Sequence, residues 1–135
     1  MPPPITALPQ FAELARQRLD PAVWTFLSGG AADEHTLRAN PQAWQNLPLW
    51  PRVLRPLAGG HTRTVLAGRE LAHPILLAPV ALQRLLHPEG EWASALAAAA
   101  QGAGVILSTQ TSVPLQRVAQ AVLDDAGRGP LWFQL

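Results

Sequence analysis

The sequence contains no cysteine and no lysine. The absence of cysteine excludes a disulfide framework, a thiolate metal site and a cysteine nucleophile, and it fits a reducing compartment, so we expect a cytoplasmic protein. All ten basic residues are arginines, and they are scattered from Arg16 to Arg128 without forming a basic run. A protein that tracks a phosphate backbone concentrates its positive charge. Nucleic acid is therefore not expected as a partner.

Charged residues and long apolar runs are also scarce. Only 14% of the 135 residues are charged, which suggests that more chain or a partner covers much of the surface. The longest apolar stretch, Ala93 to Leu107, is interrupted by polar residues and glycines and falls short of the roughly 20 residues that a membrane span needs. The first four residues lack the features of a signal peptide. We expect a soluble protein with no membrane span.

Residues 1–61 predict an N-terminal helical and extended segment. An apolar stripe over 11–19 indicates one helix. Residues 20–30 begin with aspartate and proline and end with two glycines, which are start and stop signals for a second helix. Asp33 is in position to cap a third helix, and we expect this helix to bend or end near Pro41.

Residues 62–135 predict strands that alternate with helices. Ala67 and Gly68 form a hairpin turn between two short strands. Further strands are predicted over 74–78, 104–108 and 131–135, and helices over 87–101 and 114–123. This alternation indicates βαβ units and a parallel sheet, which makes the fold class α/β. Strands of a parallel sheet are buried on both faces, which explains why these do not alternate with polar residues.

The last predicted strand runs to the end of the sequence. Trp132, Phe133, Gln134 and Leu135 are followed by no helix and no polar tail. A complete α/β domain rarely stops within a strand. We therefore expect the chain to be the front part of a longer domain.

Three patterns suggest chemistry but have simpler explanations. Residues 102–104 resemble part of a dinucleotide fingerprint, but the third glycine is missing and the glycines precede a strand, so a helix-to-strand turn is the better interpretation. A helix start explains His87, Glu89 and Glu91 without a metal ion, since no second cluster adds ligands. A nucleophilic Ser108 would need a base that no pattern marks. We predict no metal site and no catalytic residue in this chain.

Small or polar residues lie at the end of each predicted parallel strand. Pro79, Val80 and Ala81 follow the first strand, Ser108 ends the second, and Gln134 lies on the third. Proteins of the α/β class bind ligands at the carboxyl ends of their strands. Small residues let a flat ring lie against the backbone, and the two polar side chains can hydrogen-bond its edge. Tight turns and a satisfied core glutamine explain the same residues equally well.

Several motifs in register extend over nearly the whole chain. They are FLSGGAADE at 26–34, PRVL at 51–54, PILLAPVALQRLLHPEGE at 74–91, GVILSTQ at 104–110 and PLWFQL at 130–135. With these motifs the sequence resembles the FMN-dependent L-2-hydroxy acid oxidase and dehydrogenase family. Its members include glycolate oxidase, lactate oxidase, L-lactate dehydrogenase and mandelate dehydrogenase.

The resemblance implies the N-terminal portion of a (β/α)8 barrel: the leading helices, a hairpin that closes the barrel floor and the first three parallel strands. It implies that FMN lies at the carboxyl rim, with its ring against the backbone of Pro79, Val80 and Ala81. Ser108 and Gln134 would hydrogen-bond the polar edge of the flavin. Val80 replaces a common threonine and loses only a hydroxyl. The implied reaction oxidises an L-2-hydroxy acid to a 2-oxo acid, in a homo-oligomer when the chain is full-length.

Two departures from the family limit what this chain can do. Phe26 stands where the family often has a tyrosine whose hydroxyl holds the substrate carboxylate, so its substrate-binding role is open and packing is the other interpretation. The HGG-R motif with the catalytic histidine and arginine is missing, and so is the lysine that stabilises the reduced flavin. We therefore expect no activity from the chain alone. The alternative from the residues is a free-standing α/β module that binds a nucleotide or another subunit without catalysis.

Overall fold

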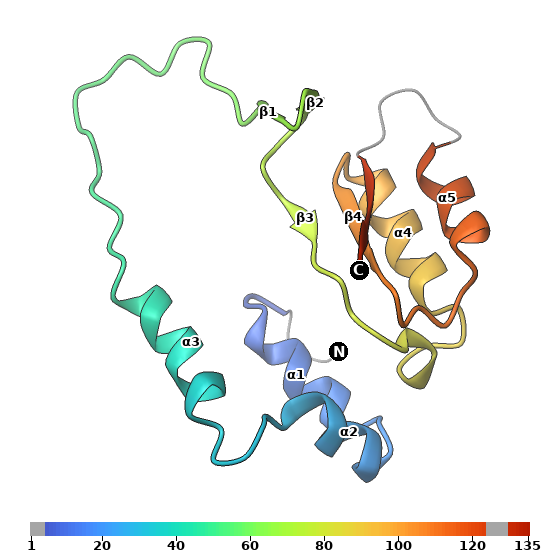
Figure 1. Ribbon diagram of the computed structural model, residues 1–135. Helices are drawn as coiled ribbons and strands as arrows, with labels where there is room; N and C mark the ends of the chain where they lie inside the picture. The colour runs from blue at the N-terminus through green and yellow to red at the C-terminus, as the bar shows by residue number, and fades with distance from the viewer. Residues whose placement is uncertain (1–4, 124–129) are drawn as a thin grey trace. The chain divides into compact units, whose positions relative to one another are not determined.

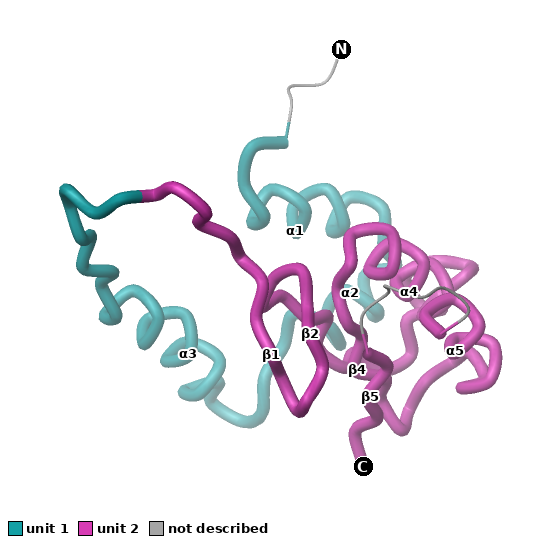
Figure 2. The backbone as a smooth tube through the Cα atoms, turned by 90° about the horizontal axis from the view of Figure 1, so that it is seen from above, with its two compact units in different colours: residues 1–56 teal, residues 57–135 magenta. Residues whose placement is uncertain are grey.

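The structure, a computed structural model, describes residues 5–123 and 130–135. The chain divides into two compact units, residues 1–56 and residues 57–135 (Figure 2). The first unit is helical, and none of its described residues is buried. The second unit contains all the described strands and the hydrophobic core.

Three short helices make up the first unit, as the sequence predicts. They are α1 (Pro9–Arg16), α2 (Pro21–Ser28) and α3 (His35–Gln45). The predicted cap of α2 is present, because the Asp20 carboxylate accepts a hydrogen bond of 2.8 Å from the backbone N–H of Ala22. The cap predicted for α3 is wrong, and of the two outcomes predicted near Pro41, a bend or an end, the helix does not end there.

Asp33 does not cap α3, and Pro41 does not end it. Glu34 lies between Asp33 and the helix in a left-handed conformation with φ of 57°, and no side chain caps the helix start. The proline removes one N–H, so the Leu37 carbonyl loses its partner within the helix. Since α3 has no buried residue, water can reach that carbonyl, and the helix continues past the proline.

The second unit begins with the predicted hairpin. Strand β1 (Thr64–Leu66) pairs antiparallel with β2 (Arg69–Leu71). The turn residues Ala67 and Gly68 both have positive φ, 49° and 77°. Two consecutive positive φ angles are what a tight two-residue hairpin of this twist requires. The hairpin prediction is confirmed.

A three-stranded parallel sheet follows, in the order β3-β4-β5 (Figure 1). Its strands are β3 (Leu76–Leu77), β4 (Gly104–Ser108) and β5 (Leu131–Gln134). Helix α4 (Glu91–Ala100) connects the first pair, and α5 (Leu115–Leu123) lies between the second pair. The predicted βαβ units are confirmed, although β3 is shorter than expected.

Helix α4 starts later than the sequence predicts. The predicted helix starts at residue 87, but α4 begins at Glu91. Gly90 has φ of 52° and ψ of −133°, which lie far outside the helical region, so it separates the preceding turn from the helix. The residues before it form a turn, and a short 3₁₀ helix, η1 (Gln83–Leu85), lies closer to β3.

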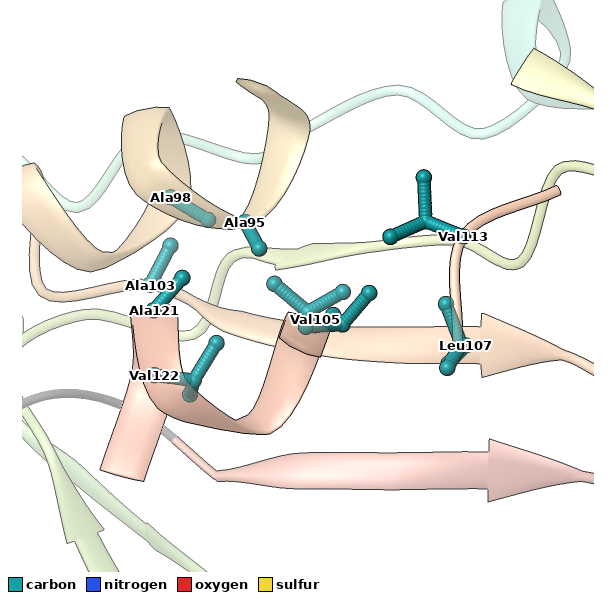
Figure 3. Close-up of a cluster of buried hydrophobic side chains, with 9 residues drawn as sticks. Ala95, Ala98, Ala103, Val105, Leu107, Val113, Ala121 and Val122 are labelled. Carbon is teal, nitrogen blue, oxygen red and sulfur yellow. The ribbon is translucent and has the colours of Figure 1, made fainter. Parts of the chain in front are cut away.

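The core lies between β4 and the two helices (Figure 3). Val105 and Leu107 of β4 are 5% and 2% exposed and pack with alanines of α4 and with Val118 of α5, which is fully buried. The complete buried cluster is Ala95, Ala98, Ala103, Val105, Leu107, Val113, Val118, Ala121 and Val122. Because side chains of a strand alternate between its faces, β4 presents Gly104, Ile106 and Ser108 to the opposite face.

The glycines at residues 102 and 104 are explained by backbone geometry. Gly102 has φ of 67°, the left-handed conformation that ends many helices. A Cβ on Gly104 would lie 2.3 Å from Cδ2 of Leu76 and 2.9 Å from Cδ of Pro130, so only glycine fits between the neighbouring strands. The interpretation as a helix-to-strand turn is confirmed. Within 5–123 and 130–135, no helix is long and apolar enough to cross a membrane.

Candidate functional site

The carboxyl ends of the three parallel strands meet at one edge of the sheet (Figure 1). Pro79, Val80 and Ala81 lie just beyond β3, and Ser108 and Gln134 are the last residues of β4 and β5. The strand register pairs Ser108 with Gln134 directly. The structure therefore brings together all the rim residues that the sequence predicts.

The open face of the sheet is the one that α4 and α5 do not cover. Paired residues in parallel strands direct their side chains to the same face, so the register with Gly104, Ile106 and Ser108 assigns residues of β3 and β5 to it. These residues are Leu76, Trp132 and Gln134. Ile106 and Trp132 are half-buried, and Gln134 is exposed. The open face is apolar in its middle and polar at the carboxyl end.

Ser108 is buried, with 5% of its surface exposed. Its Oγ accepts a hydrogen bond of 3.1 Å from the backbone N–H of Gln110, and its carbonyl accepts one of 3.2 Å from Thr111. Among the residues that the structure describes, no acceptor takes the hydroxyl proton of Ser108. The turn interpretation is therefore confirmed, because the hydroxyl oxygen supports the loop, and the ligand interpretation stays a prediction, for which the hydroxyl still has a proton to donate.

The loop after β3 carries small side chains at residues 79–81. Pro79 and Ala81 are half-buried, and Val80 is 42% exposed. The Val80 carbonyl accepts a hydrogen bond of 3.4 Å from Nε2 of Gln83. The next residue, Leu82, has a left-handed φ of 53° and donates its N–H to the Gln110 carbonyl at 3.0 Å. This bond joins the loop after β3 to the loop after β4.

Glu91 is the residue in this region that the sequence analysis missed. It is 1% exposed, and its carboxylate accepts hydrogen bonds from the Gln83 N–H at 3.1 Å, the Ser112 N–H at 3.0 Å and the Ser112 hydroxyl at 2.7 Å. The sequence analysis explains Glu91 by a helix start alone. A stronger signal was present, because Glu91 is spaced i, i+4, i+7 and i+8 with the buried alanines of α4.

Hydrogen bonding keeps Glu91 in its charged form. Burial alone, the largest influence, would raise the pKa of this carboxyl. The bonds from the N–H and hydroxyl of Ser112, from its own N–H and from Gln83 together outweigh burial, and the pKa of Glu91 lies below its ordinary value of 4.5. The carboxylate is therefore ionised at neutral pH and acts as an acceptor only.

The remaining predicted residues lie elsewhere. Phe26 belongs to α2 in the first unit, where 60% of its side chain is exposed. His87 and Glu89 are exposed and lie in the turn before α4. Residues 5–123 and 130–135 contain no group of three or more His, Cys, Asp or Glu side chains that could hold a metal ion.

Comparison with known proteins identifies the relatives of this chain. A sequence model of the FMN-dependent dehydrogenase family matches residues 15–135. The chain belongs to this family. It is 43% identical to an L-lactate oxidase of Roseobacter sp., in a match that covers 98% of this chain and 34% of the relative. It is 38% identical to 2-hydroxyacid oxidase 2 of Bos taurus, in a match that covers 98% of this chain and 36% of that relative. The chain thus spans about a third of the length of the curated relatives it matches.

Solved structures of mandelate oxidase have the same fold over this region. A crystal structure of mandelate oxidase with (S)-2-phenylpropionate has a TM-score of 0.88, with 38% identity over 98% of this chain and 38% of that one. A mandelate oxidase mutant with a monooxide FMN adduct has a TM-score of 0.81, with 38% identity over 93% of this chain and 38% of that one. The resemblance inferred from the sequence motifs is confirmed.

Proposed function

We propose that this chain is the N-terminal portion of a (β/α)8 barrel that oxidises L-2-hydroxy acids with FMN. Residues 1–61 would form the leading segment, and residues 62–135 the floor hairpin and the first three barrel strands. The observation that carries the proposal is the family match over residues 15–135 together with the open parallel sheet β3-β4-β5. An open parallel sheet with helices on one face is what part of a barrel looks like, since closure needs all eight strands.

The rim residues suit the ring of FMN. The backbone of Pro79, Val80 and Ala81 would lie against the flavin, and the small size of these residues supports that role. Ser108 has a hydroxyl proton with no acceptor in the described chain, and Gln134 beside it carries both a donor and an acceptor. A neutral hydroxyl and an amide match the carbonyl and nitrogen edge of a flavin. The rim therefore fits the cofactor of the family.

FMN would supply the redox chemistry by taking up two electrons from the substrate, while the protein orients the reactants and tunes their electrostatics. The residues of this chain would hold the ring and exclude water from its face. No lysine is present to stabilise negative charge, and the HGG-R motif is absent. We propose that the groups that take the substrate proton lie outside residues 1–135, so the chain alone is inactive.

The substrate class follows from the family and the names of the relatives. By name, one relative oxidises L-lactate and another oxidises a 2-hydroxy acid. Phe26 stands where the family often has a tyrosine, and a phenyl ring cannot donate a hydrogen bond to a carboxylate. We propose that another group holds the substrate carboxylate. The full-length protein would be a homo-oligomer.

The experiment uses a full-length version, defined as residues 1–135 followed by the segment that follows the matched region in the L-lactate oxidase of Roseobacter sp. Without oxygen, L-lactate, glycolate or L-mandelate should bleach its flavin absorbance, and the 135-residue chain with added FMN should show no reaction. General base catalysis contributes about 10² to 10⁴-fold, so loss of that group is easily measured. Turnover by the chain alone, or a full-length version that binds no FMN, would contradict the proposal.

A further inference from the structure

Glu91 connects two loops that both carry rim residues. Its Oε1 accepts from the N–H of Gln83, which follows the loop of residues 79–82, and from the N–H of Ser112, in the loop after β4. Its Oε2 accepts from the hydroxyl of Ser112 at 2.7 Å. One buried carboxylate thereby receives three hydrogen bonds from segments 8 and 21 residues away.

A second set of bonds extends this connection to the flavin rim. The Ser112 Oγ also accepts from the N–H of Arg84 at 3.0 Å, so the two loops are joined through the serine as well. Gln83 binds the Ser94 hydroxyl of α4 through its Oε1 at 2.6 Å, and its Nε2 donates to the Val80 carbonyl. Gln83 alone therefore links Glu91 to the proposed flavin contact at Val80 through hydrogen bonds.

Gly90 lets the loops approach this closely. A Cβ at this position would lie 2.9 Å from Cγ of Arg84 and 3.2 Å from Oγ of Ser112. Its positive φ with ψ of −133° is a conformation that essentially only glycine adopts. Gly90 thus allows the close approach of the two loops, and the Glu91 carboxylate supplies the hydrogen-bond acceptors that join them.

We propose that Glu91 is a positioning residue that fixes the loop after β3 against the loop after β4, and so sets the spacing between the backbone of Val80 and the hydroxyl of Ser108. This inference rests on the proposed flavin site. Glu91 itself touches neither rim residue; it acts through Gln83 and Ser112. Charge-assisted bonds to a carboxylate are stronger than neutral ones, which suits a group that must hold two loops.

The test compares Glu91→Ala and Glu91→Gln with Glu89→Ala in the full-length version. Glu89 is an exposed acid two residues away, so its removal controls for the lost side chain and charge. Glu91→Ala leaves buried N–H groups without an acceptor, and we expect the Kd for FMN to rise at least about 10-fold. Glu91→Gln keeps one oxygen acceptor and should recover most of the affinity, whereas Glu89→Ala should bind FMN normally.

Hydrogen exchange separates positioning from a loss of the whole fold. In Glu91→Ala, the amides of Gln83 and Ser112 should exchange at least about 10-fold faster, while the amides of Val105 and Leu107 in β4 keep their rates. Ser112→Ala, a milder change, should show the same pattern to a smaller degree if Glu91→Ala does not fold.

Three results would decide against part of the account. Faster exchange at Gln83 and Ser112 with unchanged FMN affinity would overturn the positioning role and leave the proposed function intact. If all amides of Glu91→Ala exchanged faster, and if Glu91→Gln lost as much affinity for FMN as Glu91→Ala, the carboxylate would support the fold as a whole and would not position the rim. If the unmodified protein binds no FMN, the proposed function fails, and the exchange arm still tests whether Glu91 holds the two loops together.

Discussion

The two units of the chain contain similar apolar side chains but differ in what covers them. In residues 57–135, Leu107 is 2% exposed, and Val118 of α5 is fully buried in the same cluster. In residues 1–56, Leu49 is 95% exposed and Trp50 is 91% exposed. Amphipathic helices gain most of their stability from packing of the apolar face. The second unit thus contains its own source of stability, and the described part of the first does not.

This difference teaches that apolar periodicity predicts an element without predicting its partner. The apolar stripe of α1 and the stripe of α5 look alike in the sequence. Val118, Ala121 and Val122 of α5 are buried, whereas Phe11 and Leu14 of α1 are exposed within their unit.

The largest contrast is expected between two leucines. Leu107→Ala removes a buried side chain and should lower the free energy of unfolding of the 135-residue chain by about 2–5 kcal/mol. Leu49→Ala should change it by less than about 0.5 kcal/mol, because the side chain is already exposed. Urea unfolding followed by tryptophan fluorescence measures both. If Leu49→Ala lowered the free energy of unfolding as much as Leu107→Ala does, and if this effect depended on protein concentration, a second copy of the chain would be covering the first unit.

The pH dependence of stability should reveal Glu91. Because its pKa is lower in the folded chain than the ordinary 4.5, the charged form stabilises the fold fully above that value. This contribution is lost as the pH falls through the lower folded pKa. The urea midpoint, measured between pH 6 and pH 3, should fall with the pH in the unmodified chain. Glu91→Gln should reduce this fall, and the control Glu89→Gln should leave it unchanged. A profile of Glu91→Gln identical to the unmodified chain would contradict the hydrogen-bonded carboxylate.

The smallest contrast concerns two arginines. Cζ of Arg117 in α5 lies 5.3 Å from the ring centroid of Trp92 in α4, so the cation faces an aromatic ring. Arg117→Gln should cost about 0.5–1 kcal/mol. Arg38→Gln in the first unit removes an exposed ion pair with Glu34, 3.8 Å long, and should cost less than about 0.5 kcal/mol. Thermal unfolding of both variants compares them, and a larger effect at Arg38 would reverse the expected order.

Local signals explain most of what the sequence predicted about the fold. Gly68 favours the hairpin because glycine takes the positive φ of this turn without steric cost, and Ala67 takes a positive φ beside it. The continuous apolar runs of β4 and β5 predict parallel strands, and of these β4 is mostly buried whereas no residue of β5 is. Backbone geometry explains the errors: Glu34 in a left-handed conformation separates Asp33 from α3, and Gly90 makes α4 begin at Glu91. Neither follows from the helix start and stop signals used.

The candidate site was predictable where it follows from strand ends. Ser108 and Gln134 are the last residues of neighbouring strands, so sequence spacing alone places them together. Glu91 was not found because its partners, Gln83 and Ser112, lie on other loops and become neighbours only when the sheet forms. A polar residue on the buried stripe of a helix is the signal to search for.

The central claim is that the rim of the second unit holds the flavin, and flavin content tests it most directly. In the full-length version after gel filtration, Ser108→Ala and Gln134→Ala should each raise the Kd for FMN about 5- to 100-fold, since a lost buried hydrogen bond costs about 1–3 kcal/mol. Ser28→Ala and Gln45→Ala, the same changes in the first unit, should retain the unmodified ratio of flavin to protein. Equal flavin content in all four variants would contradict the account.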